Sequence, residues 1–133
     1  MIPSVNELLT TDLEVTTQPS KNYKMHIENN IITGTCNDMD AMLQVIYKIL
    51  NTERYLYPIY SWNYGIELRD LFGEPATYVC AELERRITEA LTQDDRVESV
   101  SDFKFEINKH EVVCTFVVHT IFGDKKIEKE VSY

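Results

Sequence analysis

The hydrophobic residues of the chain change their spacing several times, and each change predicts a structural element. Near the N-terminus, Tyr23, Met25 and Ile27 alternate with polar residues, which is the period-two pattern of a β-strand. The pair Asn29–Asn30 follows, and asparagine tolerates the positive φ angles that a hairpin turn requires. We therefore expect a β-hairpin in this region that ends at Gly34.

The next segment has the spacing of an amphipathic helix that runs to about Leu50, with Asn37 or Asp38 as a suitable N-cap. Its apolar side chains fall on one stripe, formed by Met39, Met42, Leu43, Ile46, Ile49 and Leu50. A one-sided stripe ordinarily faces the core, so we interpret the methionines as packing residues rather than as a promiscuous binding groove.

A second helix is predicted from Pro75, because a proline in the first helical turn lacks only an N–H that has no partner there. It covers about 18 residues, or roughly 27 Å, and ends at Gln93–Asp95. Its predicted buried face consists of Val79, Leu83, Ile87, Ala90 and Leu91. Its predicted exposed face consists of Glu82, Arg85, Arg86 and Glu89, with Glu82 and Arg86 spaced for an i,i+4 ion pair.

The C-terminal part of the chain has the alternation of an antiparallel sheet. Strands are predicted at 103–107, 112–119 and 125–133, with turns at 108–110 and 122–125. The middle strand is apolar on both faces, so it should be central and covered. The third strand alternates Glu128 and Glu130 with apolar residues, which is typical of a guarded edge strand.

These patterns predict an α+β fold in which two long helices pack on a C-terminal antiparallel sheet. An N-terminal β-hairpin and an extended arm complete it. The arm is assigned to residues 1–20, which are polar and contain Pro3 and Pro19, and a single domain is assigned to 21–133. A chain of 133 residues fits one domain and can bury a core without disulfide or metal support.

Composition narrows the possible functions. The net charge of −9 argues against a nucleic-acid partner and against an anionic membrane surface. The three cysteines are widely spaced and form no zinc pattern, so we expect free, buried thiols. The first residues do not have the pattern of a signal peptide, and no apolar run is long enough for a membrane span. We therefore expect the protein in the host cytoplasm.

Catalytic patterns are weak in this sequence. No serine or cysteine lies in a nucleophile motif, and His119 is interpreted as a strand residue at the sheet surface. With 22 acidic residues, accidental carboxylate pairs are certain, and the pair Asp94–Asp95 supplies too few ligands for calcium. We predict no catalytic residue, no cofactor and no metal site.

An aromatic segment follows the first helix and has two interpretations. Five aromatic residues lie within residues 55–64, namely Tyr55, Tyr57, Tyr60, Trp62 and Tyr64. Pro58 and the lack of periodicity predict irregular structure, and Gly65 is predicted to provide a turn. Such rings either cap the core or anchor a protein interface, and the sequence leaves both possibilities open.

The end of the second helix also offers two interpretations. Asp94 and Asp95 oppose the helix dipole at this position, which suggests that one of them has a partner. Arg96 follows at the start of a strand. It forms either a local salt bridge or a forked donor for carbonyls or carboxylates of a neighbouring protein.

Three segments carry a resemblance to a known family: TERYLYPIYSWNYGIEL, ELERRITEALTQDDRV and TFVVHTIFGDKKIEKEV. They resemble the XkdS-like proteins of PBSX-type defective prophages, over about Tyr23 to Val131. That family is similar to a wider baseplate wedge family called lysozyme-like, which includes protein W of temperate contractile phages. The resemblance implies a structural protein of a phage tail or tailocin. Such proteins lie in the baseplate around the tail tube, six copies in a ring, bind other wedge subunits and start the sheath.

The resemblance also implies where the chain binds its partners. The wider family has a Glu-Pro-Arg motif that docks on the helical core bundle of the wedge, and Asp94, Asp95 and Arg96 occupy the matching positions, with Asp95 in place of proline. The family presents its last strands to the sheath protein, and a free edge in 125–133 would suit strand addition. The predicted interface residues are Tyr60, Trp62, Tyr64, Asp94, Asp95, Arg96, Ile127, Lys129 and Val131. The family's common name raises one alternative, a peptidoglycan-degrading tail enzyme.

Overall fold

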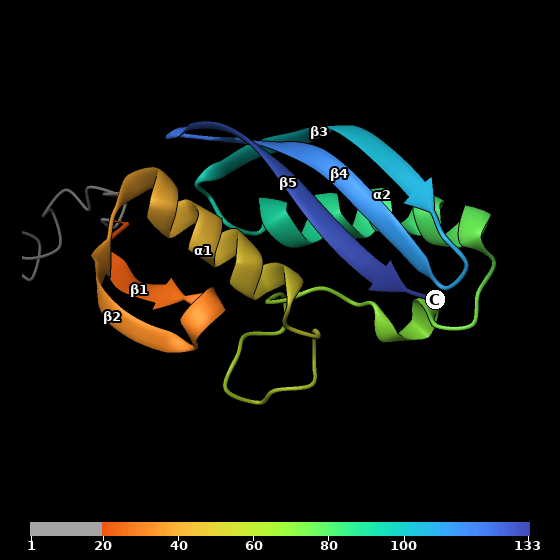
Figure 1. Ribbon diagram of the computed structural model, residues 1–133, viewed down its shortest axis with the longest axis horizontal. Coiled ribbons are helices and arrows are strands. Elements are labelled where there is room, and N and C mark those ends of the chain that lie inside the picture. Colours follow the sequence, from red (N-terminus) through yellow and green to blue (C-terminus); the bar gives the residue numbers. More distant parts are fainter. Residues whose placement is uncertain (1–19) are drawn as a thin grey trace, which may run out of the picture.

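The computed structural model describes residues 20–133, and the predicted fold class is confirmed there (Figure 1). The elements are β1 (Asn22–His26), β2 (Ile31–Cys36), α1 (Asp38–Leu50), α2 (Ala76–Thr92), β3 (Val97–Ile107), β4 (Glu111–Thr120) and β5 (Gly123–Ser132), with short 3-10 turns η2 (Ile27–Asn29) and η3 (Arg69–Leu71). The sheet β3–β4–β5 lies against α2, while α1 runs beside β5 and carries the β1–β2 hairpin. Residues 1–19 of the predicted arm lie outside the described residues.

The predicted hairpin is present, but its end was wrongly placed. Asn30 adopts the left-handed conformation between the strands (φ 53°), as the asparagine pair predicted. Gly34 does not end the hairpin, because β2 continues to Cys36 with Gly34 inside it at φ +73°. The pairing register shifts between Tyr23 and Met25, so the strand contains a bulge that a period-two pattern does not show.

A buried glutamine of α1 fastens the hairpin to the rest of the domain. The Gln44 Oε1 atom accepts a hydrogen bond from the Met25 backbone N–H (3.0 Å), and Gln44 Nε2 donates to the Tyr23 carbonyl (2.6 Å). The amide thus replaces a neighbouring strand at this edge of β1. An isolated two-stranded sheet is marginally stable in water, so the hydrogen bonds of Gln44 help to stabilise the hairpin.

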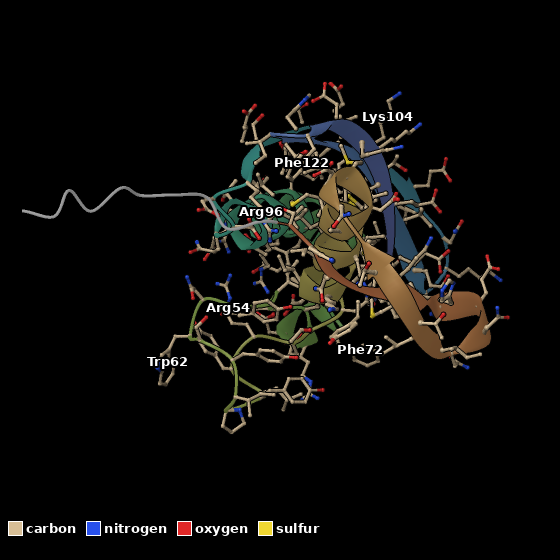
Figure 2. All side chains as sticks on the ribbon, turned by 90° about the vertical axis from the view of Figure 1, so that its left-hand side faces the viewer. Arg54, Trp62, Phe72, Arg96, Lys104 and Phe122 are labelled. Atoms are coloured by element: carbon tan, nitrogen blue, oxygen red, sulfur yellow. The ribbon has the colours of Figure 1, made fainter. Side chains whose placement is uncertain are left out.

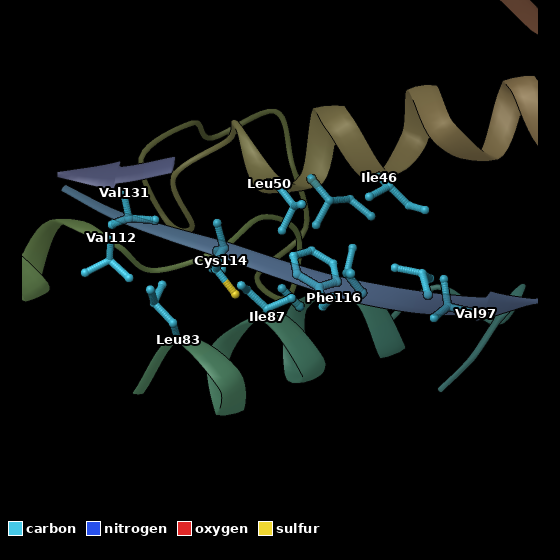
Figure 3. Packing of buried hydrophobic residues seen from close by; sticks show 14 of the residues in the cluster. Ile46, Leu50, Leu83, Ile87, Val97, Val112, Cys114, Phe116 and Val131 are labelled. Carbon is cyan, nitrogen blue, oxygen red and sulfur yellow. The ribbon is translucent and has the colours of Figure 1, made fainter. Parts of the chain in front are cut away.

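The core lies between the two helices and β4 (Figure 3). All five residues predicted for the buried face of α2 are buried, and Met42, Ile46, Ile49 and Leu50 are the fully buried part of the α1 stripe. β4 is the central strand, as predicted, and its inner row is Val112, Cys114, Phe116 and Val118. Its outer row is only half-buried, because the core packs on the other face, so the prediction of cover on both faces was wrong.

Two details of the C-terminal part and of α2 differ from the sequence prediction. Thr120 pairs directly with Gly123, so the turn is Ile121–Phe122 and β5 begins two residues before the predicted Lys125. Pro75 is the N-cap residue of α2, one position before the first helical turn.

The connection between α1 and α2 is irregular but firmly attached. Ile66 donates its N–H to the Thr52 carbonyl (2.9 Å), and Arg54 donates its N–H to the Ile66 carbonyl (3.1 Å). Gly65 has φ +92°, and a Cβ atom there would lie 2.5 Å from the Thr52 oxygen. The predicted role of Gly65 in a turn is confirmed, since any side chain would push this pairing apart.

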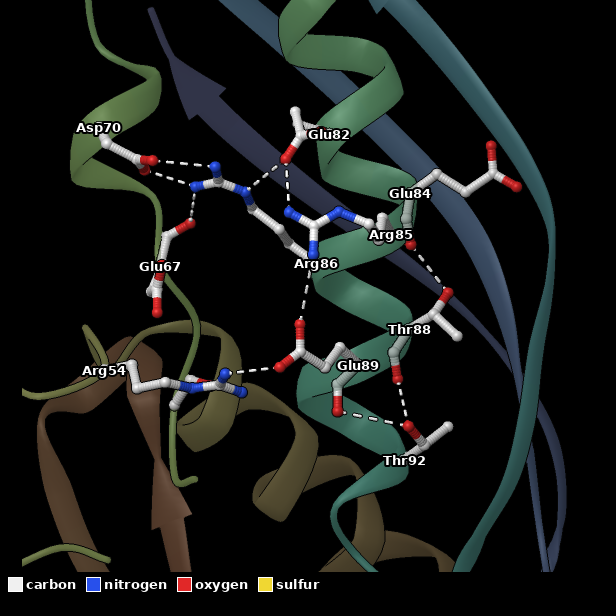
Figure 4. A network of polar contacts seen from close by, with 11 residues as sticks. Arg54, Glu67, Asp70, Glu82, Glu84, Arg85, Arg86, Thr88, Glu89 and Thr92 are labelled. Atoms are coloured by element: carbon white, nitrogen blue, oxygen red, sulfur yellow. Dashed lines mark hydrogen bonds and ion pairs between the residues drawn. The ribbon is translucent and has the colours of Figure 1, made fainter. Parts of the chain in front are cut away.

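Arg86 was predicted on the exposed face of α2, and that prediction was wrong. Its side chain is only 8% exposed, because the segment before α2 folds over it (Figure 4). The guanidinium pairs with both carboxylate oxygens of Asp70, donates to the Glu67 carbonyl (2.9 Å) and donates to Glu82 Oε2 (3.1 Å). The last contact is the predicted i,i+4 pair, which is confirmed.

Candidate functional site

The corner after α2 is held by a two-point ion pair. Arg96 Nε lies 2.9 Å from Asp94 Oδ1 and Nη2 lies 2.8 Å from Oδ2, while the Arg96 backbone N–H also donates to Oδ1 (3.0 Å). These hydrogen bonds hold the pKa of Asp94 below its usual value, although its burial opposes the shift. The acid at the helix end therefore has a partner. Asp95 beside it is exposed.

Arg96 is engaged within the chain rather than held free for a partner. Besides Asp94, it donates through Nη1 to the Ser20 hydroxyl oxygen at 3.1 Å, and its side chain is 19% exposed. In this structure Arg96 therefore forms the local salt bridge, which is the first of its two interpretations.

The aromatic segment divides into rings that pack and rings that are exposed. Tyr64 packs against the core cluster, where burial raises its pKa, and its ring stacks on Tyr60 with centroids 4.5 Å apart. Trp62 is 83% exposed and leans on Tyr55, with centroids 5.7 Å apart, and Ile59 is 85% exposed. Figure 2 shows Trp62 projecting at the outside of this loop. Tyr64 therefore packs on the core, and the exposed Trp62 stays a predicted interface anchor.

The structure brings the aromatic segment and the corner together. Asn63 Nδ2 donates to Gln93 Oε1 at 3.0 Å, and a cavity of about 150 Å³ between them is lined by Tyr64 and Asp94 among others. At the base of the segment, Arg54 Nη1 lies 2.8 Å from Glu89 Oε1 of α2. Residues 55–64 and 93–96 thus form one surface, which we call the loop–corner surface.

The third predicted group lies elsewhere, on β5. This strand pairs with β4 on one side, and no strand of the described region pairs with its other edge. A groove of about 810 Å³ runs along that edge between residues 126–130, α1 and β1. A second cavity of about 410 Å³ continues past 130–132, next to Phe72. We call this pair of cavities the edge groove.

The hydrogen bond at the C-terminal end of β5 shows which backbone N–H groups of the strand point toward β4 and which point away from it. Tyr133 donates its N–H to the His110 carbonyl (3.1 Å), toward β4, and the register is regular along the whole strand. Because bonding direction alternates along an antiparallel strand, the N–H groups of Lys126, Glu128 and Glu130 face the edge groove. In residues 20–133, no strand pairs with these groups.

Lys129 lies half-buried in the edge groove. Its Nζ atom donates to Asn51 Oδ1 at 3.1 Å, and burial lowers its pKa. Within residues 20–133, no carboxylate forms an ion pair with it. The family resemblance placed Lys129 among the predicted interface residues, but the sequence gave no sign of its partial burial.

One catalytic-looking arrangement was missed by the sequence analysis. Ser101 Oγ lies 2.6 Å from His119 Nε2, and His119 Nδ1 lies 2.9 Å from Asp124 Oδ1. The three residues lie on adjacent strands on the outer face of the sheet, and none of them lines the cavities described above. Nucleophilic catalysis also needs a cleft and oxyanion donors. What the geometry provides is a polar link across three strands.

No group of metal-ligating side chains is found in residues 20–133. The helices of this region include none that is long and apolar enough to cross a membrane. All three cysteines are free thiols, as predicted, with Cys36 and Cys114 buried and Cys80 half-buried. Burial raises the pKa of Cys114 to about 12, which makes it an unreactive packing residue.

Comparison with known proteins identifies the class. A sequence model of the contractile injection system sheath initiators matches residues 12–123, so the chain belongs to that family. Its members are structural components of contractile tails rather than enzymes. A relative is the phage-like element PBSX protein XkdS of Bacillus subtilis (strain 168). It is 39% identical over 128 residues, with 91% of each chain covered.

The resemblance to XkdS-like proteins is therefore confirmed, and with it a role beside the sheath and other tail components. The further relation to the lysozyme-like wedge family and protein W stays a prediction.

Proposed function

We propose that the chain starts the sheath of a contractile tail by accepting a strand of the sheath protein on β5. The observation that carries this proposal is the edge of β5 beside the edge groove, with which no strand of residues 20–133 pairs. Strand addition uses main-chain hydrogen bonds for affinity and side-chain pockets for specificity. β5 offers outward N–H groups at residues 126, 128 and 130, and the groove offers the pockets.

The shape of the groove fits an extended segment. A paired strand lies about 4.7–4.9 Å from its neighbour, and an added strand would enter the groove that residues 126–130 line. Leu43, Ile46 and Leu50 of α1 line it and would cover the inward side chains of the added strand. Burial of apolar area is worth about 25 cal/mol per Å², so this lining adds to the main-chain bonds.

The charged residues of β5 explain why the free protein need not aggregate. Lys125, Lys126, Glu128 and Glu130 are exposed along the strand. Charges on an edge strand oppose pairing with an unmatched strand. Addition is thereby reserved for a segment whose own charges match.

The loop–corner surface is proposed to attach the chain to the baseplate, on the helical core bundle formed by other wedge proteins near the tail tube. Exposed Trp62 and Ile59 are suitable hot-spot anchors, and Tyr60, which packs against Tyr57, is also exposed. Asp94 and Arg96 keep the corner in one shape, and exposed Asp95 is free to meet a cation of the partner. Six copies in a ring would present six β5 edges as a template for the first sheath disc. Assembly is proposed in the host cytoplasm, with no nucleic-acid or membrane partner.

Substitution of Glu128 by proline tests strand addition. Glu128→Pro removes an N–H that faces the groove and leaves the β3–β4–β5 ladder intact, since edge strands tolerate proline there. We expect a folded protein that enters baseplates but yields tail tubes without ordered sheath in electron micrographs. Glu128→Ala, which keeps the N–H, should give normal tails. Sheathed tails of full length from the folded Glu128→Pro protein would refute strand addition on β5.

The alternative that the family's common name raises, a peptidoglycan-degrading tail enzyme, can be tested at the Ser101–His119–Asp124 arrangement. Purified wild-type protein is expected to release no soluble fragments from peptidoglycan. Release that disappears in a Ser101→Ala variant would establish this activity instead.

A further inference from the structure

The side chains of β5 that face α1 form a short row of alternating character. Ile127, Lys129 and Val131 lie opposite Phe116, Cys114 and Val112 of β4, which are fully buried. The row therefore reads apolar, cationic, apolar. Residues 126, 128 and 130 point to the other face of the sheet and are exposed.

Lys129 is the residue in this row that has no oppositely charged partner within residues 20–133. Its ammonium is half-buried and bonds the amide oxygen of Asn51, but it meets no carboxylate within residues 20–133. Glu128 and Glu130 also line the groove, and the charge of Glu130 acts on the ammonium from a distance, but neither carboxylate forms an ion pair with it. Asp40, which also lines the groove, is in the first turn of α1, whereas Asn51 follows its last turn, roughly 16 Å away along the helix.

An added strand would complete the burial of this ammonium. Burying a charge is costly unless an opposite charge accompanies it. In a sheet, a side chain directly opposite is close enough to pair, and opposite charges there are favourable while like charges are unfavourable. The neighbour of Lys129 in the added strand therefore decides which segments are accepted.

We propose that the segment accepted by β5 carries a carboxylate opposite Lys129, with an apolar residue two positions away on each side. The occupant is thus an extended segment of another tail subunit with the pattern apolar–x–acid–x–apolar. This inference rests on the proposed strand addition and names its specificity. Lys129 acts as a selector, which rejects a segment that places lysine or arginine at the same point.

The experiment attaches a strand to the full chain. The sequence Val-Thr-Val-Thr-Asp-Thr-Val-Thr-Val is joined after Tyr133 through a flexible Gly/Ser linker of about 12 residues, which gives a high effective concentration. A matched strand has Asn in place of the central Asp. Both are made in the wild-type chain and in Lys129→Met, and hydrogen exchange is measured at the amides of residues 126, 128 and 130.

In the wild-type chain, we expect protection of these amides to be about fivefold greater with the Asp strand than with the Asn strand, as for a cross-strand pair. In Lys129→Met, this ratio should fall to about one, while the amides of β4 keep their wild-type protection. Lys129→Gln serves as a second variant if methionine disturbs the fold.

The possible outcomes separate this inference from the proposed function. Equal protection by both strands in the wild-type chain would overturn the acid preference but leave strand addition standing. A preference for Asp that persists in both Lys129 variants would overturn Lys129 as its source. Absence of protection from either strand would overturn strand addition on this edge, and the inference with it.

Discussion

Two arginines of this chain show how a single residue fixes the position of a whole segment. Arg86 binds Asp70 and the Glu67 carbonyl, so the segment before α2 is held against the helix. Arg96 binds Asp94 and Ser20, so it holds the corner in one shape and contacts the first described residue. Arginine suits both tasks because its planar fork donates several hydrogen bonds at fixed angles.

Replacement of Arg86 tests the first of these attachments. Arg86→Met keeps much of the side-chain volume but removes four hydrogen bonds, so we expect a loss of about 2 kcal/mol in the free energy of unfolding. Urea denaturation measures this loss. Arg85→Met is the matched control on the same helix and should cost far less, because Arg85 is mostly exposed and its ion pairs are screened by water. Equal, small losses in both variants would contradict an anchoring role for Arg86.

The Asp94–Arg96 pair should make stability depend on pH in the acid range. The pKa of Asp94 is lowered in the folded state, chiefly by its bonds to Arg96. The stabilisation is therefore present above the unfolded pKa of about 4 and is lost as pH falls through the folded pKa. Asp94→Asn should lower the free energy of unfolding by about 1 kcal/mol at pH 7, and the difference should shrink as pH falls below the unfolded pKa of about 4. Asp95→Asn, at an exposed position, should change neither value; a difference for Asp94→Asn that stays constant with pH would exclude this linkage.

Among the elements, the β1–β2 hairpin depends most on one contact. Its two strands form a separate sheet, and Gln44 of α1 supplies the hydrogen bonds that a third strand would otherwise provide. The hairpin residues Lys24, Met25 and Ile27 also line the edge groove. A loosened hairpin would therefore widen the site proposed for the sheath segment.

Replacement of Gln44 by methionine separates this contact from simple packing. Gln44→Met keeps the volume but removes both hydrogen bonds to β1, each worth about 1 kcal/mol. We expect amide exchange in residues 22–36 to become at least about tenfold faster while β3, β4 and β5 keep their protection. Leu43→Met, one position away and half-buried, should leave exchange in the hairpin unchanged. Uniform acceleration across the domain would show that Gln44 supports the whole core instead.

The elements also show how far the sequence can predict this fold. The buried face of α2 and the central position of β4 were predictable, because each depends on one repeating pattern of apolar residues. Gln44 and Arg86 were not, because polar residues in a helix read as exposed until the segment that covers them is known. The contact of Ser101 with His119 was hidden by the bulge between Ser101 and Lys104, which shifts the register of β3. For the candidate site, the sequence indicated the individual residues. It did not indicate that residues 55–64 and 93–96 lie together in the loop–corner surface.

In the whole molecule, the two proposed surfaces are built from different parts of the chain. The loop–corner surface comes from the connection after α1 and from the end of α2, whereas the edge groove is formed by β5, α1 and β1. Lys129 contacts Asn51 at the end of α1, whereas Ile59 and Trp62 belong to the loop between the helices. Defects in the two surfaces should therefore have different consequences for a tail.

Replacement of the exposed anchors tests this separation. The double variant Ile59→Ser with Trp62→Ser removes the two most exposed apolar side chains of the loop and should leave thermal unfolding unchanged, since neither is buried. Loss of two interface anchors is expected to cost at least about 2 kcal/mol of binding, so purified tail particles should contain at least about tenfold less of the chain by immunoblot. Tyr78→Ser, an exposed aromatic on α2, is the matched control and should be incorporated normally. Glu128→Pro should also be incorporated normally, but its tails should lack sheath. If the double variant is present in normal amounts in sheathed tails, the loop is not part of the baseplate interface. That result would leave the proposal for β5 unchanged.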